Sequence, residues 1–417
     1  MSTDGPLGAR PSWTPPGERG GEDRRAPRED ETDVLIVGAG LIGCATAYYL
    51  GREGVECLVV DRGEVNREGS GANAGSLHIQ IRRPERAYSD ETLRQFIPMK
   101  VAAGRLWAQI EQELGCSVGL KVRGGLLVAE TDEELAVIRE KVAYERELGL
   151  ETEVLSASEM RAIAPNLSEH LVGGSFDPAE GLANPLLVTP AYVRLATAHG
   201  ARFRIHTAVS ATEALRGGGF LVTTSTGMIR AKRILNAAGP WAGTLAAMAG
   251  APLPVEGRVI QASVTERREP ILDQLIQHVR PALSLKQTTY GTFMIGGGWP
   301  ATTDPQTGRP DIDPACVAGN LGVALRVLPM LRDVQVVRTW LGVIAHSLDR
   351  DGQRLQIFGE IPSVPGYFVV AGGTLFTMGP LFSRLAAELM TTGRTSYPVD
   401  IFHPERFGFA RSMSRRW

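Results

Sequence analysis

Residues 32–62 constrain the fold of this 417-residue chain more than any other stretch. They read TDVLIVGAGLIGCATAYYLGREGVECLVVDR, in which an apolar run of strand length leads into Gly38, Gly40 and Gly43 at GxGxxG spacing. An apolar helix with small residues follows, and a second apolar run at residues 57–60 ends in Asp61. The order of strand, glycine turn, helix, strand and acid predicts a dinucleotide-binding βαβ unit.

Each part of this unit has a physical reason. Gly38 permits the tight turn, Gly40 lets a pyrophosphate approach because it has no Cβ, and Gly43 lets the helix lie close to the strand. The helix N-terminus can face the phosphates with its unpaired N–H groups. Asp61 can accept hydrogen bonds from a ribose diol and would repel a 2′-phosphate, which argues against NADP. A glycine turn with a purely structural role is the alternative interpretation.

The composition is that of a soluble globular protein, with 43% hydrophobic and 22% charged residues. A net charge of −2 gives no reason to expect nucleic acid as a partner. Four cysteines, Cys44, Cys57, Cys116 and Cys316, lie far apart, so we expect a reducing cytoplasm, no metal site and no disulfide framework. No apolar run reaches the roughly 18 residues that a membrane-spanning helix needs, and the N-terminus lacks a signal peptide.

Strand-like and helix-like segments alternate along the chain, which predicts an α/β fold with a second, sheet-rich domain inserted in pieces. Helical periodicity covers residues 91–114, 133–148 and 190–199, and residues 124–129 read as a strand. Residues 1–31 have almost no aliphatic side chains and are expected to form a disordered extension. Residues 411–417 form a short basic tail, either a solvated end or a contact for a partner. The predicted division assigns residues 32–115, 186–250 and 355–410 to the dinucleotide domain and residues 116–185 and 251–354 to the substrate domain.

Three further segments bear on which dinucleotide is bound. Residues 69–80, GSGANAGSLHIQ, form a loop of small residues whose amides can meet an anionic or carbonyl edge. Residues 236–242, NAAGPWA, end a strand with small residues where a bulky cofactor can pass. Residues 371–380, AGGTLFTMGP, precede a helical run, so their amides can stabilise negative charge on a reduced isoalloxazine ring.

Together these four segments resemble the D-amino-acid oxidase superfamily of FAD enzymes, which includes sarcosine oxidase, glycine oxidase and glycerol-3-phosphate dehydrogenase. The resemblance runs from about Val34 to Phe407. Within the superfamily, GANAGSLHIQ and SLKQTTYGTFMIGGGWPA are most similar to the β subunits of heteromeric opine oxidases, D-hydroxyproline dehydrogenases and sarcosine oxidase. The resemblance implies a Rossmann-like FAD-binding domain of the glutathione-reductase type and a discontinuous antiparallel-sheet substrate domain.

The resemblance also implies a set of residues that hold FAD. Some relatives attach the flavin through a cysteine near the segment that matches residues 338–352, but no cysteine is present there, so we expect noncovalent FAD. The implied cofactor-binding residues are Gly38, Gly40, Gly43, Asp61, Arg62, Ser70, Ala72, Asn73, Ala74, Gly75, Ser76, Val209, Ala238, Gly239, Gly372, Phe376, Thr377, Met378 and Gly379.

The implied reaction is oxidation of the C–N bond of a secondary amine, imino acid or D-amino acid of the opine, hydroxyproline or sarcosine type. The substrate gives a hydride to flavin N5. No second GxGxxG unit is present for NAD(P)H, so the electrons are expected to pass to oxygen, a quinone or a partner subunit of a hetero-oligomer. Two alternatives stay open: oxidation of a 2-hydroxy acid or glycerol phosphate, and a non-catalytic flavin electron-transfer subunit.

The substrate clamp departs from the relatives' pattern. Glycine-oxidase-like members carry an arginine soon after a W-x-G pattern, where this chain has Ile344, and Thr374 and Leu375 replace a common His-Gly pair. A carboxylate is best held by a bidentate arginine, so simple α-amino-acid oxidation is in doubt. The candidate replacements are Lys286, His346 and Tyr290; Arg82, Arg83 and His78 are weaker ones.

Overall fold

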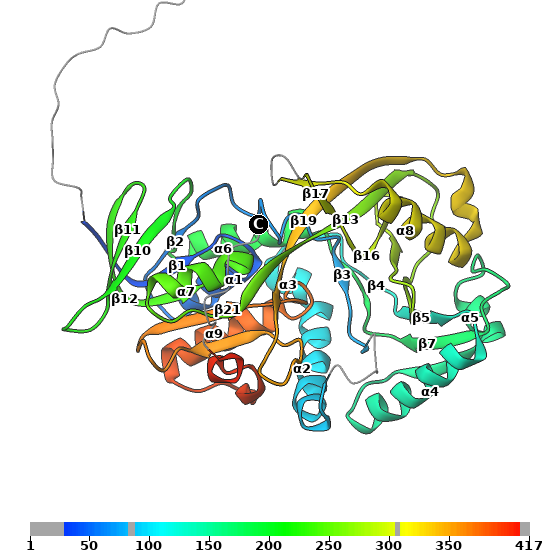
Figure 1. Cartoon of the computed structure of the whole chain (residues 1–417), viewed down its shortest axis with the longest axis horizontal. Helices are drawn as coiled ribbons and strands as arrows, with labels where there is room; N and C mark the ends of the chain where they lie inside the picture. Colours follow the sequence, from blue (N-terminus) through cyan, green and yellow to red (C-terminus); the bar gives the residue numbers. More distant parts are fainter. Residues whose placement is uncertain (1–28, 82–87, 305–308, 409–417) are drawn as a thin grey trace, which may run out of the picture.

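The computed structural model describes residues 29–81, 88–304 and 309–408 and has two halves, each built on a sheet (Figure 1). Most of the expected disordered extension, the basic tail at residues 411–417, and Arg82 and Arg83 lie outside the described residues. The first strand, β1 (Glu29–Val37), begins slightly before the expected start near Thr32. Its first residues pair with β12 in parallel register, and Asp30 forms an ion pair with Arg204.

The first sheet carries the βαβ unit. Its parallel strands follow the order β9 (Arg202–Arg204), β2 (Cys57–Val60), β1, β12 (Gly227–Asn236) and β21 (Tyr367–Ala371). Two antiparallel strands, β10 (Val209–Ala214) and β11 (Phe220–Thr224), extend it beside the first half of β12, and β20 (Ile357–Glu360) pairs with β21. Because β1 lies between β2 and β12, the glycine turn that follows β1 opens at the centre of the sheet's carboxyl edge.

Helices pack around this sheet. The helix after the glycine turn, α1 (Leu41–Arg52), contacts both α6 (Pro185–Ala198) and α9 (Gly379–Thr392), and α9 also contacts α2 (Asp90–Ala108). Two short helices, α3 (Ile110–Leu114) and α7 (Ala242–Met248), complete this half, with 3₁₀ turns at Gly239–Trp241, Asp400–Phe402 and Pro404–Phe407. The Asn184 side chain caps α6 and Pro185 occupies its first turn, so the helix begins before the expected residue 190.

The second half is built on a sheet in the order β19-β13-β16-β15-β14-β5-β7-β6. Its pairs are antiparallel except β14 with β5, so the expected antiparallel sheet is in fact mixed. The strands are β5 (Gly125–Ala129), β6 (Glu153–Ser156), β7 (Gly173–Asp177), β13 (Val255–Arg267), β14 (Leu275–His278), β15 (Ser284–Gln287), β16 (Thr292–Pro300) and β19 (Val336–Ser347). Its helices are α4 (Asp132–Glu147), α5 (Ala157–Ile163) and α8 (Pro314–Val327), with a 3₁₀ turn at Pro329–Asp333.

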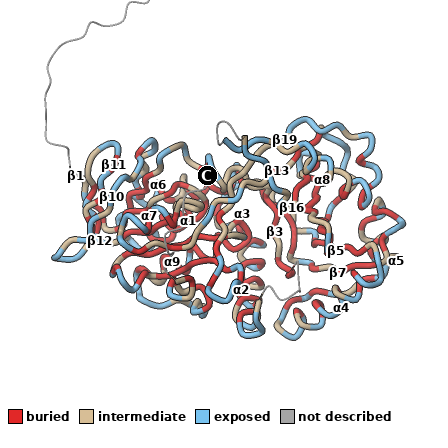
Figure 2. The backbone as a smooth tube through the Cα atoms, in the orientation of Figure 1, coloured by how far each residue is buried: buried red, intermediate tan, exposed pale blue. Residues whose placement is uncertain are grey.

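Each half has its own buried core (Figure 2). One cluster surrounds the first sheet with its helices, and another lies between the second sheet and α8. Two small sheets are separate from these: β3 (Ser76–Leu77) and β4 (Lys121–Val122) both pair with β8 (Gly181–Leu182), and β17 (Thr302–Thr303) pairs with β18 (Pro310–Asp311). The assignment of chain segments to two domains stays a prediction, although the strands of each sheet come from the segments expected for it.

Candidate active site

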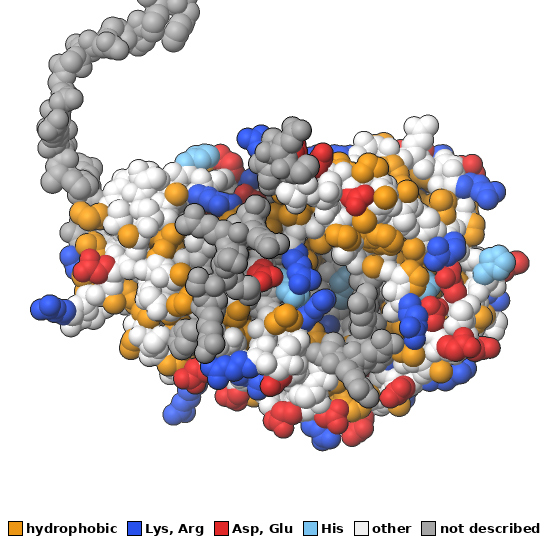
Figure 3. Space-filling view, viewed as in Figure 1, with side chains coloured by type: hydrophobic (Ala, Val, Ile, Leu, Met, Phe, Trp, Pro, Cys, Tyr) orange, Lys and Arg blue, Asp and Glu red, His pale blue; other side chains and the backbone are white. Residues whose placement is uncertain are grey.

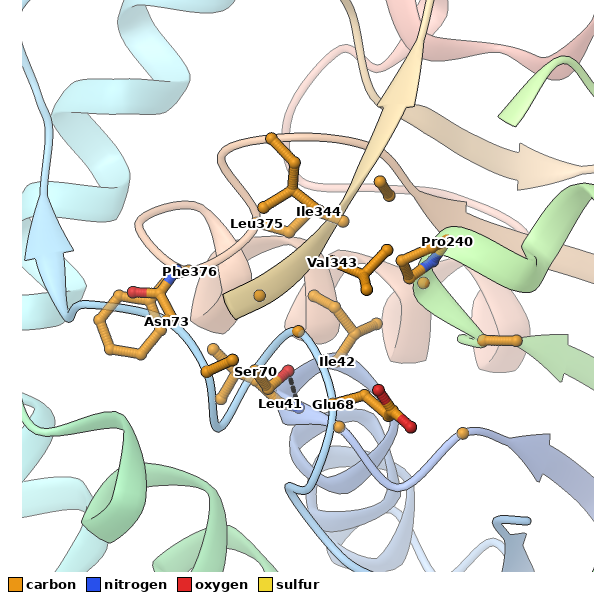
Figure 4. Close-up of a pocket in the computed structure, with 18 of the residues that line it drawn as sticks. Leu41, Ile42, Glu68, Ser70, Asn73, Pro240, Val343, Ile344, Leu375 and Phe376 are labelled. Atoms are coloured by element: carbon orange, nitrogen blue, oxygen red, sulfur yellow. Dashed lines mark hydrogen bonds between the residues drawn. The ribbon is translucent and has the colours of Figure 1, made fainter. Parts of the chain in front are cut away.

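A cavity of about 550 Å³ extends from the glycine turn to the strands of the second sheet (Figure 4). This volume lies within the roughly 300–1,000 Å³ of small-molecule and cofactor sites. One end is lined by the glycine turn, Asp61 and Val209. The other end, here called the second-sheet end, is lined by Ser284, residues 296–298, Trp340, residues 342–345 and residues 372–377.

The glycine turn has the geometry that its sequence predicted. Gly38 has a φ of 116°, and a Cβ there would lie 2.4 Å from the Ala237 carbonyl oxygen. A Cβ on Gly43 would lie 1.9 Å from the Gly38 carbonyl oxygen, so this glycine sets the close approach of α1 to β1. Gly38 and Gly40 line the cavity, whereas Gly43 acts behind its wall. The first turn of α1 therefore begins at the cavity, beside two positions, Gly38 and Gly40, that have no Cβ.

Asp61 lies at the end of β2 and lines the cavity. Its Oδ2 accepts a hydrogen bond of 2.7 Å from the Ala39 amide and its Oδ1 one of 2.8 Å from the Gly63 amide. These bonds fix the carboxylate, and each oxygen keeps a lone pair for a ribose hydroxyl. The neighbouring Arg62 guanidinium lies 3.8 Å from the centre of the Trp241 ring, a cation–π contact that holds it against the wall.

The loop at residues 70–76 forms another wall. The Ser70 hydroxyl accepts a hydrogen bond of 3.0 Å from the Leu41 amide, drawn as a dashed line in Figure 4. Farther along, Trp340 on β19 donates its indole N–H to the Ala72 carbonyl at 2.9 Å. Gly75 does not line the cavity; its φ is 78° and its amide donates to Asn73 Oδ1, so it shapes the loop.

The segment before α9 supplies the wall at residues 372–377. Thr374 has a φ of 57°, a conformation that is costly for a β-branched residue. Gln356 holds this strained turn, because its Nε2 donates to the Gly373 carbonyl at 2.8 Å and to Thr374 Oγ1 at 2.7 Å. Figure 4 shows Leu375 beside Ile344 of β19, so the strained loop and the second sheet share this wall.

Met378 and Gly379, two expected cofactor contacts in this segment, do not line the cavity. The amides of Met378 and Gly379 donate to the carbonyls of Thr374 and Phe376 within the turn. Met378 is fully buried, and a Cβ on Gly379 would lie 2.7 Å from Leu41 Cδ2, so both residues pack against the core. The helix start at α9 thus uses these amides to close its own turn.

Most of the other expected cofactor residues do meet in the cavity. Those that line it are Gly38, Gly40, Asp61, Arg62, Ser70, Ala72, Asn73, Ala74, Ser76, Val209, Ala238, Gly239, Gly372, Phe376 and Thr377. Trp340 and the triple glycine at residues 296–298 also line the cavity, although they were not among the expected cofactor residues. For the glycines, the sequence did contain a signal of a binding site, because glycines within a strand often mark the close approach of a ligand.

These features fit FAD. The cradle at Gly38 and Gly40 has no Cβ, Asp61 offers fixed carboxylate oxygens, and the cavity continues past residues 70–76 to a second, largely apolar end. A cofactor with an ADP part and a flat ring system matches such a shape. No cysteine is among the described residues that line the cavity, and all four cysteines of the chain are free thiols in the described part.

Lys286 is completely buried and does not line the cavity. Its Nζ donates to the Ser76 hydroxyl at 2.6 Å, and Ser76 in turn contacts the Ser284 hydroxyl at 3.0 Å. Burial lowers the pKa of Lys286 to about 7. Ser76 stands between the amine and the cavity, so Lys286 approaches the cavity through Ser76, and its expected ion pair with a substrate carboxylate stays a prediction.

The other two expected catalytic residues, His346 and Tyr290, lie at different distances from the cavity lining. His346 lies on β19 two residues beyond the cavity-lining Ile344. Burial, followed by the charges of Arg258 and Arg354, lowers its pKa. Tyr290 lies in the turn between β15 and β16, is 51% exposed, and is not among the described lining residues. The β15–β16 hairpin runs away from the cavity between Ser284 and this turn, so Tyr290 does not line the cavity, and its role in closing the pocket stays a prediction.

A buried ionic network holds the chain that follows β3. Glu180 accepts hydrogen bonds from the amides of Ile79 and Gln80 at 2.7 and 3.0 Å and from the side chains of Gln80 and Gln277. Burial raises the pKa of Glu180 to about 7 and lowers that of Lys100 to about 8. Lys100 donates to the carbonyl of His78, which lines the cavity, so the network fixes the cavity wall from behind.

Within the described ranges, no cluster of three or more His, Cys, Asp or Glu side chains is placed to hold a metal ion. Over the same ranges, none of the helices combines the length and hydrophobicity needed to cross a bilayer.

Comparison with known proteins gives one consistent family. The sequence profile described as DAO: FAD dependent oxidoreductase matches residues 33–389. The B subunit of opine oxidase from Rhizobium meliloti is 27% identical over 403 residues, covering 90% of this chain and 98% of that protein. The beta subunit of sarcosine oxidase from Rhodobacter capsulatus is 26% identical over 378 residues, covering 85% and 87%. Among solved structures, L-proline dehydrogenase from P. horikoshii matches with a TM-score of 0.80 at 24% identity, covering 91% and 98%, which shows the fold.

Proposed function

The chain belongs to the DAO family of FAD-dependent oxidoreductases, and from this premise we propose that it oxidises the C–N bond of a secondary amine, imino acid or D-amino acid of the opine, hydroxyproline or sarcosine type. The observation that carries the proposal is the continuity of one cavity from the glycine turn and Asp61 to the second sheet. A dinucleotide held at the first end would present its ring system to an enclosed space at the second-sheet end. Bound FAD supplies the two-electron chemistry by accepting a hydride at N5.

We infer that the cofactor is held noncovalently by the glycine turn, Asp61 and the loop at residues 70–76. The residues of this chain hold the cofactor, shape the substrate space and exclude water. Ile344 and Leu375 give the second-sheet end an apolar wall, and Ile344 stands where glycine-oxidase-like members resembled in sequence carry an arginine. Lys286 acts as a positioning residue through Ser76, and His346 lies at the edge where a substrate enters.

We propose further that the protein works as one member of a heteromeric complex and passes electrons to oxygen, a quinone or a partner protein of that complex. Support comes from the two relatives that are themselves named as subunits, those of opine oxidase and sarcosine oxidase. The likeness to the opine oxidase relative covers nearly the full length of both chains.

The test is anaerobic bleaching of the flavin in the purified holoprotein. The panel contains opines, hydroxyprolines, sarcosine and D-amino acids, with 2-hydroxy acids and glycerol phosphate as a second set. Bleaching by a member of the amine set is the expected result. Bleaching by the second set alone would assign the protein to alcohol oxidation. A flavin that stays oxidised with every compound would contradict catalysis and favour an electron-transfer role.

A further inference from the structure

Two arginines and a histidine lie together at the edge of the second-sheet end. Arg258 on β13 pairs directly with Ile344 on β19, and His346 follows Ile344 by two residues. Directly paired residues share a face of the sheet, and so do residues two apart on one strand. Ile344 and Ile260 line the cavity, so Arg258 and His346 continue the face that forms its wall.

Arg354 reaches the same region from another element, because the hydroxyl of Ser347, next to His346, donates a hydrogen bond to the carbonyl of Leu355, next to Arg354. It lies on the connection between β19 and β20, two residues before Gln356, which holds the cavity-lining turn at Gly373 and Thr374. The charges of Arg354 and Arg258 both act on the His346 ring. Figure 3 shows Lys or Arg and His side chains gathered in the hollow between the two halves.

The side chains of Arg258, Arg354 and His346 have hydrogen-bonding atoms without a partner among the described residues. Among the described residues, neither Arg258 nor Arg354 forms a side-chain hydrogen bond or an ion pair. The Nε2 atom of His346 is buried and has no hydrogen-bond partner in that part of the chain. Among the described residues, the charge of Glu256, which pairs with His346 across the strands, opposes the charges of the two arginines at the ring, so positive charge prevails.

The second-sheet end itself offers no such charge. Of the described residues that line the cavity, the arginines and lysines are Arg62 and Arg67, and these accompany Asp61 and Glu68 near the glycine turn. Arg62 is already paired with Glu68 at 3.4 Å. Among the described lining residues, no guanidinium group therefore lies beside the apolar wall, and a positive charge for an anionic substrate group there has to come from its edge.

We propose that Arg258, Arg354 and His346 form a cationic rim that binds a carboxylate of the substrate remote from the C–N bond that is oxidised. The substrate class is then an N-substituted amino acid with a second carboxylate, a refinement that rests on the proposed function. Guanidinium groups bind carboxylates through paired hydrogen bonds, and two of them from different elements fix both the position and the orientation of the anion.

The test compares two amines that differ by one carboxylate, iminodiacetate and sarcosine. Each is titrated anaerobically into the holoprotein, and the half-saturating concentration is read from the change in flavin absorbance, whether that change is a shift or bleaching. Wild type should bind iminodiacetate at least about tenfold more tightly than sarcosine, as expected for a charge-assisted contact. Arg258→Gln and Arg354→Gln should each reduce this preference roughly threefold or more, and the double variant should abolish it.

The matched control is Arg139→Gln, an exposed arginine on α4 far from the cavity in sequence and sheet order, which should keep the full preference. The sarcosine titration in each variant reports folding and flavin binding, and it should change less than about twofold. The proposed rim is contradicted if the wild type does not prefer iminodiacetate over sarcosine, including the case in which it responds to neither compound. It is also contradicted if the double variant keeps this preference. A preference expressed only as a spectral shift, with no bleaching by any amine, would support the rim and contradict the proposed oxidation.

Discussion

The indole N–H of Trp340 donates a hydrogen bond of 2.9 Å to the carbonyl oxygen of Ala72. This contact joins β19 of the second sheet to the loop that lines the cavity beside the glycine turn. A Cβ on the neighbouring Gly342 would lie 3.1 Å from the Ala72 side chain, so the strand and the loop are in close contact here. The second sheet therefore positions the loop at residues 70–76 as well as the second-sheet end of the cavity.

Trp340→Phe should weaken FAD binding about fivefold, because it keeps the ring but removes one hydrogen bond worth roughly 1 kcal/mol. Titration of the apoprotein with FAD measures the change. Trp299→Phe is the matched control: its indole N–H donates to the Ala282 carbonyl at 2.5 Å, outside the cavity, so FAD affinity should not change. Equal losses in both variants would mean that the effect is one of general stability.

Gly40→Ala should lower FAD affinity by about tenfold or more, because a Cβ there would lie 2.9 Å from Ser70 Oγ and would enter the space a pyrophosphate needs. The flavin content of the purified protein and the Kd of the apoprotein report the loss. Gly322→Ala on α8, where a Cβ meets nothing within 4 Å, should retain FAD and gain about 0.5–1 kcal/mol of stability. Full flavin content in Gly40→Ala would exclude the predicted contact.

The stability of the wild type should rise with pH between about 7 and 10.5 through Lys286. Burial lowers its folded-state pKa from 10.5 to about 7, so in this window the unfolded chain binds the extra proton. The slope reaches at most about 1.4 kcal/mol per pH unit for one proton. Lys286→Met has no amine to titrate and so lacks this pH dependence. Its melting temperature relative to wild type should therefore be highest near pH 6 and should fall by pH 9.

Lys232→Met is the control for this pH dependence. Lys232 is exposed, and its hydrogen bond to Asp33 raises its pKa, so it stays protonated from pH 6 to 9 in both states. Its stability difference from wild type should therefore be constant over that range. If the stability difference between Lys286→Met and wild type is also constant from pH 6 to 9, the Lys286 amine is charged in the folded protein over that whole range.

Glu180→Gln should destabilise the protein by about 2–4 kcal/mol. Four N–H groups donate to the two carboxylate oxygens of Glu180, and a Gln side chain offers them one oxygen. Urea unfolding at pH 8, above the pKa of about 7 to which burial raises Glu180, measures the change in the ionised state. Glu140→Gln on the exposed face of α4 should change stability by less than about 0.5 kcal/mol. A similar small change at Glu180 would mean that the network contributes little.

The sequence by itself determined the features that depend on neighbouring residues. Gly38, Gly40, Gly43 and Asp61 have their roles because the turn, the helix start and the strand end are all encoded within residues 32–62. The helices expected at residues 91–114 and 133–148 are present as α2 with α3 and as α4, because their periodicity and caps are local. The DAO resemblance is likewise confirmed.

Only the tertiary structure decided which distant residues share the cavity. Lys286 and Tyr290 are four residues apart, yet one is buried behind Ser76 and the other lies exposed in a turn, because the register of β15 with β16 sets their positions. Trp340 reaches Ala72 through strand pairing that no local pattern encodes. Local chemistry fixes a turn or a helix, whereas contacts between strands depend on the whole sheet, and here that sheet carries the substrate side of the site.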